Sequence, residues 1–257
     1  MNIRNLFRKS NKKPAIFVHI QKTAGTSIID LMKQHYQQKH VISHGNYLDG
    51  VDHARFKNDS WIDEQLISNF RNIPFLSGHF GYDFARLFMR ERYSFTFLRD
   101  PVERVLSFYY FCRNQDPNAY EIYRLCQQLS LDEFLKRGLK QSEVNAYIWN
   151  NQVWQLACGF GNPKNLDLSS FEPEKLLDMS IKHLDEFSYI GFTETFKTDC
   201  EKILEDLEAP LPQNIVASNV NRRRRPSKDL PESSLTLLEQ LTRFDQILYQ
   251  SAWSRRA

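Results

Sequence analysis

Long apolar runs, closely spaced cysteines and early acidic residues are all missing from this sequence. No apolar run approaches the roughly 20 residues of a membrane span, and none resembles the core of a signal peptide. The cysteines Cys112, Cys126, Cys158 and Cys200 lie far apart, and no two of them have the spacing of a metal or redox motif. We therefore expect a cytoplasmic protein with reduced thiols.

Acidic residues are absent before Asp30, whereas lysines and arginines are frequent there. We expect residues 1–14 to form a basic N-terminal arm and residues 15–257 to form one domain. A short basic amphipathic arm is suited to weak contact with an anionic membrane surface, and a solvated, disordered arm is the alternative. The net charge of the whole chain is only +3, which excludes a bulk polycation.

Four consecutive arginines, Arg222–Arg225, stand in a proline-flanked loop. Such a run fits a nucleic-acid contact, a solvated stretch, or a lid over a phosphorylated ligand. No aromatic residue lies between Val216 and Lys228, so nucleic-acid bases would find no stacking partner there. The composition favours a lid and predicts no nucleic-acid partner.

Short apolar runs alternate with helical patterns along the chain, which is typical of an α/β fold. Strands are expected at residues 15–20, 93–98 and 189–192, and within residues 75–81, where a short strand ends in His79. Helices are expected from residue 27 onward and at 61–70, 101–111, 130–138, 142–158, 173–187, 198–207 and the C-terminus. Residues 37–60 are expected to be mostly loop. We predict a single P-loop-like α/β domain with a central parallel sheet flanked by helices.

The helix after Arg99 carries clear start signals. Asp100 suits the N-cap, Pro101 suits the first helical position, and Glu103 is placed to complete a capping box. One side of this helix is expected to face the core: Val102, Val105, Leu106 and Tyr109. The residues expected away from it are Glu103, Arg104 and Ser107.

The loop that follows the first strand has the composition of an anion site. Backbone N–H groups and the positive end of a helix dipole meet where a strand turns into a helix. Gly25 allows close approach of the backbone, Lys22 adds a charge, and Thr26 and Ser27 add hydroxyl donors. The loop is not a Walker A motif, because it has one glycine and the lysine precedes it. An ordinary strand-to-helix turn with a surface lysine is the alternative.

Three further polar positions are candidates for function. His79 lies between Gly78 and Gly81 at a strand end, where it is either an exposed functional ring or a turn residue. Arg99 also follows a strand, where it either holds a phosphate or pairs with a local carboxylate. The polar side chains of Asn150, Asn151 and Gln152 interrupt an aromatic helix, and they suit either sugar hydroxyls or solvent.

Two segments together resemble a known family. They are His-Ile-Gln-Lys-Thr-Ala-Gly-Thr-Ser from His19 and Arg-Asp-Pro-Val-Glu-Arg-Val-Leu-Ser-Phe-Tyr from Arg99. In this order they resemble the sulfotransferases that include the heparan sulfate 2-O- and 6-O-enzymes and their bacterial relatives. Those enzymes use 3′-phosphoadenosine 5′-phosphosulfate (PAPS) and release 3′-phosphoadenosine 5′-phosphate (PAP), and the chemistry requires no metal. The stretches 192–196 and 219–227 are similar to a weaker family signature and to the family's lid loop.

The resemblance implies roles for individual residues. It places the 5′-phosphosulfate on the loop formed by Gln21, Lys22, Thr23, Ala24, Gly25, Thr26 and Ser27. It places the 3′-phosphate on Arg99 and Ser107, and it puts Asn221 and Arg225 in the lid over the nucleotide. His79 matches the family's histidine base best, and Lys22 stabilises the departing phosphate. His44 and His53 also lie between the two family segments, but in polar stretches without a strand to fix them, and His19 on the first strand is expected to be a core residue. From their polar side chains alone, Asn151 and Gln152 are expected to contact the acceptor.

The sequence differs from the eukaryotic glycan enzymes in having no membrane anchor and no paired thiols. It therefore fits a cytoplasmic enzyme that sulfates a hydroxyl of a small glycan, a glycolipid or a metabolite. Two other classes stay open from the residues alone. One is a P-loop-like nucleotide kinase, which would need magnesium ligands and a true Walker A motif. The other is a non-enzymatic binder of nucleotides or nucleic acid.

Overall fold

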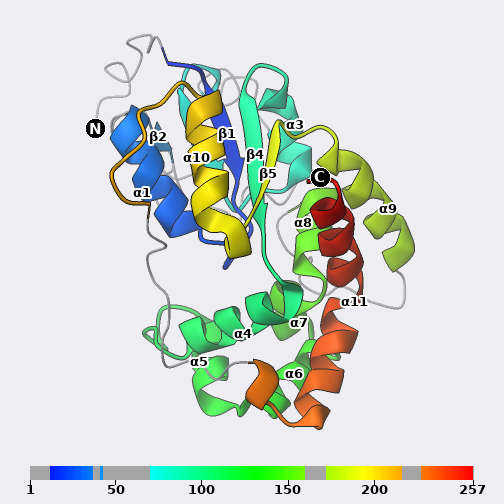
Figure 1. The fold of residues 1–257 in the computed structure, drawn as a ribbon. Coiled ribbons are helices and arrows are strands. Elements are labelled where there is room, and N and C mark those ends of the chain that lie inside the picture. Colours follow the sequence, from blue (N-terminus) through cyan, green and yellow to red (C-terminus); the bar gives the residue numbers. More distant parts are fainter. Residues whose placement is uncertain (1–11, 37–40, 43–69, 160–171, 216–226, 257) are drawn as a thin grey trace.

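The computed structural model describes residues 12–36, 41–42, 70–159, 172–215 and 227–256, and these form a parallel sheet flanked by helices (Figure 1). Within these residues the sheet has five strands in the order β2-β3-β1-β4-β5, and every neighbouring pair is parallel. The strands are β1 Ala15–Val18, β2 Val41–Ile42, β3 Phe75–Gly78, β4 Tyr93–Leu98 and β5 Tyr189–Phe192. The predicted α/β fold with a central parallel sheet is confirmed.

Alternating side chains of the strands support a helical layer on each face of the sheet. Ala15 and Phe17 of β1 pack with helices α1 (Gly25–Tyr36) and α10 (Phe196–Asp206). Ile16 and Val18 lie in a cluster on the other face. The helices of that cluster are α3 Tyr82–Met89, α8 Asn151–Ala157, α9 Pro173–Leu184 and the second half of α11 Glu232–Ser254.

A third hydrophobic cluster lies beyond the carboxyl ends of the strands, below the sheet in Figure 1. It is formed by the first half of α11 with α4 Pro101–Cys112, α5 Glu121–Gln128, α6 Leu131–Gly138 and α7 Ser142–Ile148. Short 3₁₀ turns, η6 Thr193–Thr195 and η7 Ser227–Asp229, precede α10 and α11. Because α11 spans both parts of the molecule, it joins the lower helices to those beside the sheet (Figure 1).

Local sequence signals account for most of the boundaries. The strand at 93–98 and the strand at 189–192 are as predicted, and other predicted ends differ by a few residues. The two-residue strand β2 was not expected within 37–60. The predicted helix at 61–70 lies outside the described residues except for Phe70.

The predicted helix caps are present, with one difference. Ser130 and Glu133 form a complete capping box at the start of α6. At α4 the Asp100 carboxylate accepts from the backbone N–H of Glu103 at 2.9 Å, as expected of an N-cap. The backbone N–H of Asp100, however, donates to Glu194 Oε1 at 2.9 Å. The second half of the α4 cap therefore comes from the turn after β5, which links α4 to the edge of the sheet.

The face of α4 was predicted wrongly at one position. Arg104 was expected away from the core, but its side chain is completely buried. Its guanidinium donates to the carbonyl oxygen of Tyr147 at 2.8 Å and to that of Gln21 at 3.4 Å. Backbone carbonyls of α7 and of the loop after β1 thus bond a charged side chain that an amphipathic pattern assigns to solvent.

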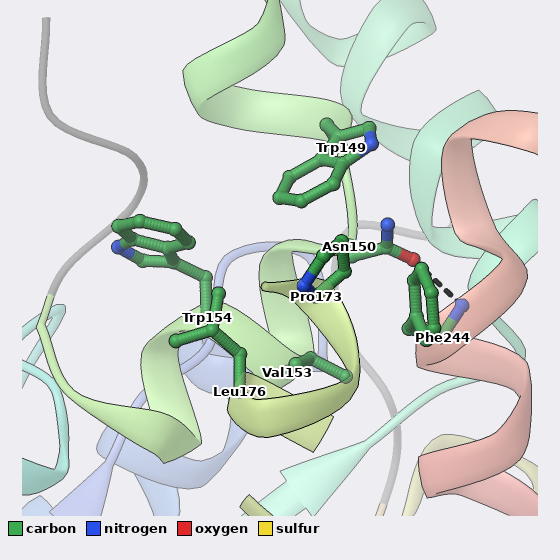
Figure 2. Close-up of a pocket in the computed structure, with 7 residues that line it drawn as sticks. All are labelled: Trp149, Asn150, Val153, Trp154, Pro173, Leu176 and Phe244. Carbon is green, nitrogen blue, oxygen red and sulfur yellow. Dashed lines mark hydrogen bonds between the residues drawn. The ribbon is translucent and has the colours of Figure 1, made fainter. Parts of the chain in front are cut away.

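The single helix predicted for Ser142–Cys158 is divided into α7 and α8. Asn150, between them, has a left-handed backbone with φ of 39°, a conformation that asparagine tolerates better than most residues. Its Oδ1 accepts from the backbone N–H groups of Phe244 at 2.9 Å and Asp245 at 3.1 Å, the first of which is drawn in Figure 2. Its own N–H donates to the carbonyl oxygen of Leu241 at 2.8 Å. Contact with α11 therefore fixes the break.

Asp245 of α11 caps α8 in return. Its carboxylate accepts from the N–H groups of Val153 at 2.8 Å and Gln152 at 3.3 Å, the first amides of α8. The carboxylate is fully buried, and this burial raises its pKa to about 6, although the charge of Arg104 acts in the opposite direction. The junction between α8 and α11 is thus held by backbone bonds in both directions.

We expect Asp245→Ala to lower the free energy of unfolding by about 3 kcal/mol, measured by urea denaturation. The change leaves two buried amides unsatisfied and removes the carboxylate that faces the buried Arg104 guanidinium. Asp178→Ala, on the exposed side of α9, is the matched control and should shift the unfolding free energy by less than about 0.5 kcal/mol. Equal stability of the two variants would contradict this account of the junction.

Candidate functional site

Three adjacent strands place the predicted site residues at one edge of the sheet. Strand β1 lies between β3 and β4, and Val18 stands opposite Gly78 on one side and Thr96 on the other. His79 follows β3, and Arg99 follows β4. The segment Gln21–Ser27, here called the anion loop, follows β1. Open parallel sheets bind ligands at this carboxyl edge, where the connections diverge.

The anion loop is wound tightly. Lys22 and Ala24 have φ values of 70° and 64°, in the left-handed region that residues with a side chain rarely adopt. The buried Thr23 hydroxyl donates to the carbonyl oxygen of Ile20 at 2.8 Å and braces the turn from within. Thr26 is exposed at the first turn of α1. Strained backbone of this kind clusters at ligand sites, where it aims backbone amides at the ligand.

Gly25 is required because the ring of His19 occupies the space beside it. A Cβ atom at position 25 would lie 1.8 Å from His19 Nε2, so every other residue would displace the ring. That ring also stacks on Phe17 at 5.3 Å and contacts the ring of His79 with centroids 4.4 Å apart. His19 therefore packs between the anion loop and His79, in agreement with its prediction as a buried residue.

Three cationic side chains converge on the anion loop. Arg99 Nη1 donates to the carbonyl oxygen of Lys22 at 3.0 Å, and Arg104 Nη1 reaches that of Gln21. The Lys22 ammonium lies 3.6 Å from the centroid of the Phe111 ring. Burial lowers the pKa of Lys22 to about 8, and the charges of Arg99 and Arg104 act in the same direction. Burial also lowers the pKa of Arg99.

Ser107 lies on the face of α4 that leads from Arg99 to Phe111. It is half-buried and one helical turn before Phe111, the residue that the Lys22 ammonium covers. The structure therefore brings Lys22, Arg99 and the Ser107 face of α4 to one place. A phosphate contact by Ser107 stays a prediction.

The acceptor residues predicted on α8 are buried. Asn151 is 2% exposed, and its Nδ2 donates to the carbonyl oxygen of Ala146 at 3.4 Å. Gln152 is fully buried and bonds the backbone of Arg99 through both ends of its amide: Arg99 N–H donates to Oε1 at 3.1 Å, and Nε2 donates to the Arg99 carbonyl at 3.0 Å. A contact of either residue with an acceptor stays a prediction.

Sequence reasoning missed Gln155 altogether. Its side chain is fully buried, and Nε2 donates to the carbonyl oxygens of His19 at 3.0 Å and Phe80 at 2.9 Å. It therefore joins the segments that follow β1 and β3. A signal was present, because Gln155 falls one turn after Gln152 among apolar residues, and a polar side chain in such a run needs a buried partner.

Several predicted residues lie outside the described part of the chain. They are Asn221 and Arg225, the remaining arginines of Arg222–Arg225, and the alternative histidines His44 and His53. The lid and its nucleotide contacts stay predictions, as does the division of the chain at residue 14. Among described residues, no cluster of three or more histidine, cysteine, aspartate or glutamate side chains is arranged to hold a metal.

The hollow drawn in Figure 2 is not the candidate site. It lies where α8, α9 and α11 meet, and it is lined by Trp149, Asn150, Val153, Trp154, Pro173, Leu176 and Phe244. It is too narrow for a water-sized sphere. The residues of α8 that touch the site segments, Gln152 and Gln155, do not line it.

The fold and this edge define an α/β protein with a tightly wound, lysine-bearing strand-to-helix loop at the carboxyl edge of its sheet. The model of the sulfotransferase family matches residues 5–250, and the chain belongs to this family. It is therefore a transferase that moves sulfuryl groups. Membership of this family argues against the two alternatives, a nucleotide kinase and a non-enzymatic binder. A comparison with curated proteins found no match. No helix among the described residues is long and apolar enough to cross a membrane.

We expect one lysine to titrate near pH 8 when the pKa values of the lysines are followed by NMR after reductive ¹³C-methylation. Lys22 is that lysine, because its ammonium is buried beside two guanidinium groups. The signal should be missing from Lys22→Met and retained in Lys136→Met, whose side chain is on the exposed face of α6. If every lysine signal titrates near the ordinary value of about 10.4, this electrostatic description is wrong.

Proposed function

We propose that the protein transfers the sulfuryl group of PAPS to a hydroxyl of a small glycan, a glycolipid or a metabolite. The observation that carries this proposal is the meeting of three strand ends, where Arg99 bonds the anion loop at the Lys22 carbonyl and the His19 ring contacts His79 beside Gly25 of the loop. In the proposal, the anion loop binds the 5′-phosphosulfate, and Arg99 with Ser107 binds the 3′-phosphate. Asn221 and Arg225 belong to the lid.

The donor site follows from charge and backbone geometry. Lys22 and Arg99 are cationic, and the Arg99 guanidinium donates to the backbone carbonyl of Lys22. The left-handed backbone at Lys22 and Ala24 is of the kind that forms anion-binding concavities. An arginine binds a phosphate through two parallel hydrogen bonds, whereas a lysine acts as a mobile point charge. Two such groups side by side suit a ligand with two separate anionic groups, which PAPS has.

The transfer itself needs little covalent work from the protein. The acceptor oxygen attacks the sulfur in line, the bond from sulfur to the 5′-phosphate oxygen breaks, and PAP leaves. Lys22 and the loop amides stabilise the negative charge that develops on the departing phosphate oxygen. His79 accepts the proton of the acceptor hydroxyl through a ring nitrogen. Because the His79 ring contacts the His19 ring beside the loop, base and donor are held close to each other.

The acceptor, a cytoplasmic location and a weak membrane contact of the N-terminal arm belong to the proposal as well. Incubation with labelled PAPS and a panel of sugars, glycolipids and phenols identifies the acceptor. Cell fractionation tests the location. A panel that shows transfer from ATP and none from PAPS would restore the kinase alternative.

We expect PAP to bind much more tightly than adenosine 5′-phosphosulfate, which lacks the 3′-phosphate, when both are titrated calorimetrically. Arg99→Ala should weaken PAP by about 2–4 kcal/mol, the scale of a lost charge-assisted pair. The same change should affect adenosine 5′-phosphosulfate less, which separates loss of the 3′-phosphate contact from loosening of the loop at the Lys22 carbonyl. Equal affinity of the wild-type protein for the two nucleotides would falsify the 3′-phosphate assignment.

We expect His79→Ala to lower kcat by about 10²–10⁴, the contribution of a positioned base. PAP affinity should be nearly unchanged, because His79 serves the acceptor and not the donor. The measurement is turnover at saturating PAPS with the acceptor found in the panel, together with a PAP titration that shows an intact donor site. Full turnover would move the base elsewhere, to His53 outside the described residues or to Glu103 on α4.

A further inference from the structure

We propose that Gln152 and Gln155 of α8 are positioning residues that separately set the two halves of the catalytic site, Gln152 the donor half at Arg99 and Gln155 the acceptor half at His79. The proposal rests on the proposed function for the roles of Arg99 and His79. The structural part of the proposal is that two side-chain amides hold the segments that carry Arg99 and His79. This part rests only on contacts of the described residues.

Gln155 joins the segments that carry the two histidines. One NH₂ group donates to the carbonyl of His19 at 3.0 Å and to the carbonyl of Phe80, next to His79, at 2.9 Å. His19 belongs to the segment after β1 and Phe80 to the segment after β3, so the bond spans two neighbouring strands. Because the rings of His19 and His79 are in contact, a change in the distance between these carbonyls changes the place of the His79 ring.

Gln152 has an independent target. Its side-chain amide forms two hydrogen bonds with the backbone of Arg99, accepting from the N–H and donating to the carbonyl. Arg99 begins the connection from β4 to α4. These two bonds hold the backbone from which the Arg99 guanidinium reaches the Lys22 carbonyl. Gln152 therefore acts on the donor site, and its hydrogen bonds among the described residues go to Arg99 and Asp245 and not to the segments that Gln155 joins.

The carboxyl end of α8 adds a second restraint on the His79 segment. A Cβ atom at Gly81 would lie 2.4 Å from the carbonyl oxygen of Cys158, so this backbone approach requires glycine. The same carbonyl accepts from the N–H of Asp83 at 2.8 Å. Since Asp245 and Asn150 fix the other end of α8 on α11, the helix is a rigid support for both glutamines.

Only an amide meets the requirements at Gln155. Two backbone carbonyls need two donors from one uncharged group, which the carboxamide NH₂ supplies. Methionine has nearly the same shape and no donor, and glutamate would turn a carboxylate toward the carbonyls. Both carbonyls are then left without this partner, and the strand ends are free to separate.

The experiment compares Gln155→Met and Gln152→Met with Asn145→Leu as the control. Asn145 is a matched residue, because its buried Nδ2 donates to the carbonyl oxygen of Gly138 at 2.8 Å between α6 and α7, outside the site. For each protein, kcat at saturating PAPS, the Kd of PAP and the Tm are measured. Imidazole ¹H–¹⁵N NMR spectra, assigned by His79→Ala, report the environment of the His79 ring.

We expect Gln155→Met to lower kcat about 10- to 100-fold, the effect of a misplaced reacting group, and to move the His79 signals while the Kd of PAP changes less than about threefold. Gln152→Met should raise the Kd of PAP about tenfold and leave the His79 signals nearly unchanged. The Asn145→Leu variant should lower Tm without either effect.

Two results would overturn the proposal. One is a pattern in which both glutamine variants change kcat and Kd together in proportion to the loss of Tm, as a purely structural role requires. The other is a Gln155→Met spectrum in which the His79 signals do not move. The spectrum needs no turnover, so it decides the structural part even where PAPS proves not to be the donor. If the His79 signals stay in place in Gln155→Met while the wild-type protein transfers sulfuryl groups from PAPS, this proposal is contradicted and the proposed function is not.

Discussion

Backbone carbonyls at the ends of parallel strands must find donors when the chain leaves the sheet, and here one short helix supplies them. The amides of Gln152 and Gln155 bond the backbone after β4 and the carbonyls after β1 and β3. Gln152, Gln155, His19 and Phe80 are buried and Arg99 is partly buried, so these bonds replace ones that water would otherwise make. The shape of the site therefore depends on α8, and the shape of α8 depends on its junction with α11 through Asp245 and Asn150.

The electrostatics of the site depend on the same framework. Burial lowers the pKa of Lys22 most, and the charges of Arg99 and Arg104 lower it as well. Cations held together in a poorly solvated place repel one another, and an incoming anion relieves that repulsion. Arg104 is held there by carbonyl oxygens of Tyr147 and Gln21, so its charge adds to the potential of the anion loop without occupying it.

Local patterns in the sequence were sufficient for four of the five described strands, for most helices and for the place of the loop after β1. Strand β4 is rich in aromatic residues and buried throughout, and the Asp100 cap joins residues only three apart, so a short stretch of sequence is enough to predict both. Arg104 was misplaced because amphipathic periodicity treats a charged side chain as solvent-facing and contains nothing about distant carbonyls. The break at Asn150 was missed for a similar reason: residues of α11, more than 90 positions later, provide its bonds.

In the candidate site, too, residues placed by neighbouring sequence could be predicted, and residues with distant partners could not. The positions of Lys22, Gly25 and Arg99 at the carboxyl edge could be predicted because a strand end, a turn and a helix start are indicated by neighbouring residues. Gln155 has partners 136 and 75 positions away, and no local pattern specifies them. Yet a glutamine inside the apolar segment from Val153 to Ala157 must bond something buried, and in an α/β fold the nearest unpaired groups are the strand ends. A buried amide on a helix that packs beside the carboxyl edge of a parallel sheet therefore marks a helix that shapes the site.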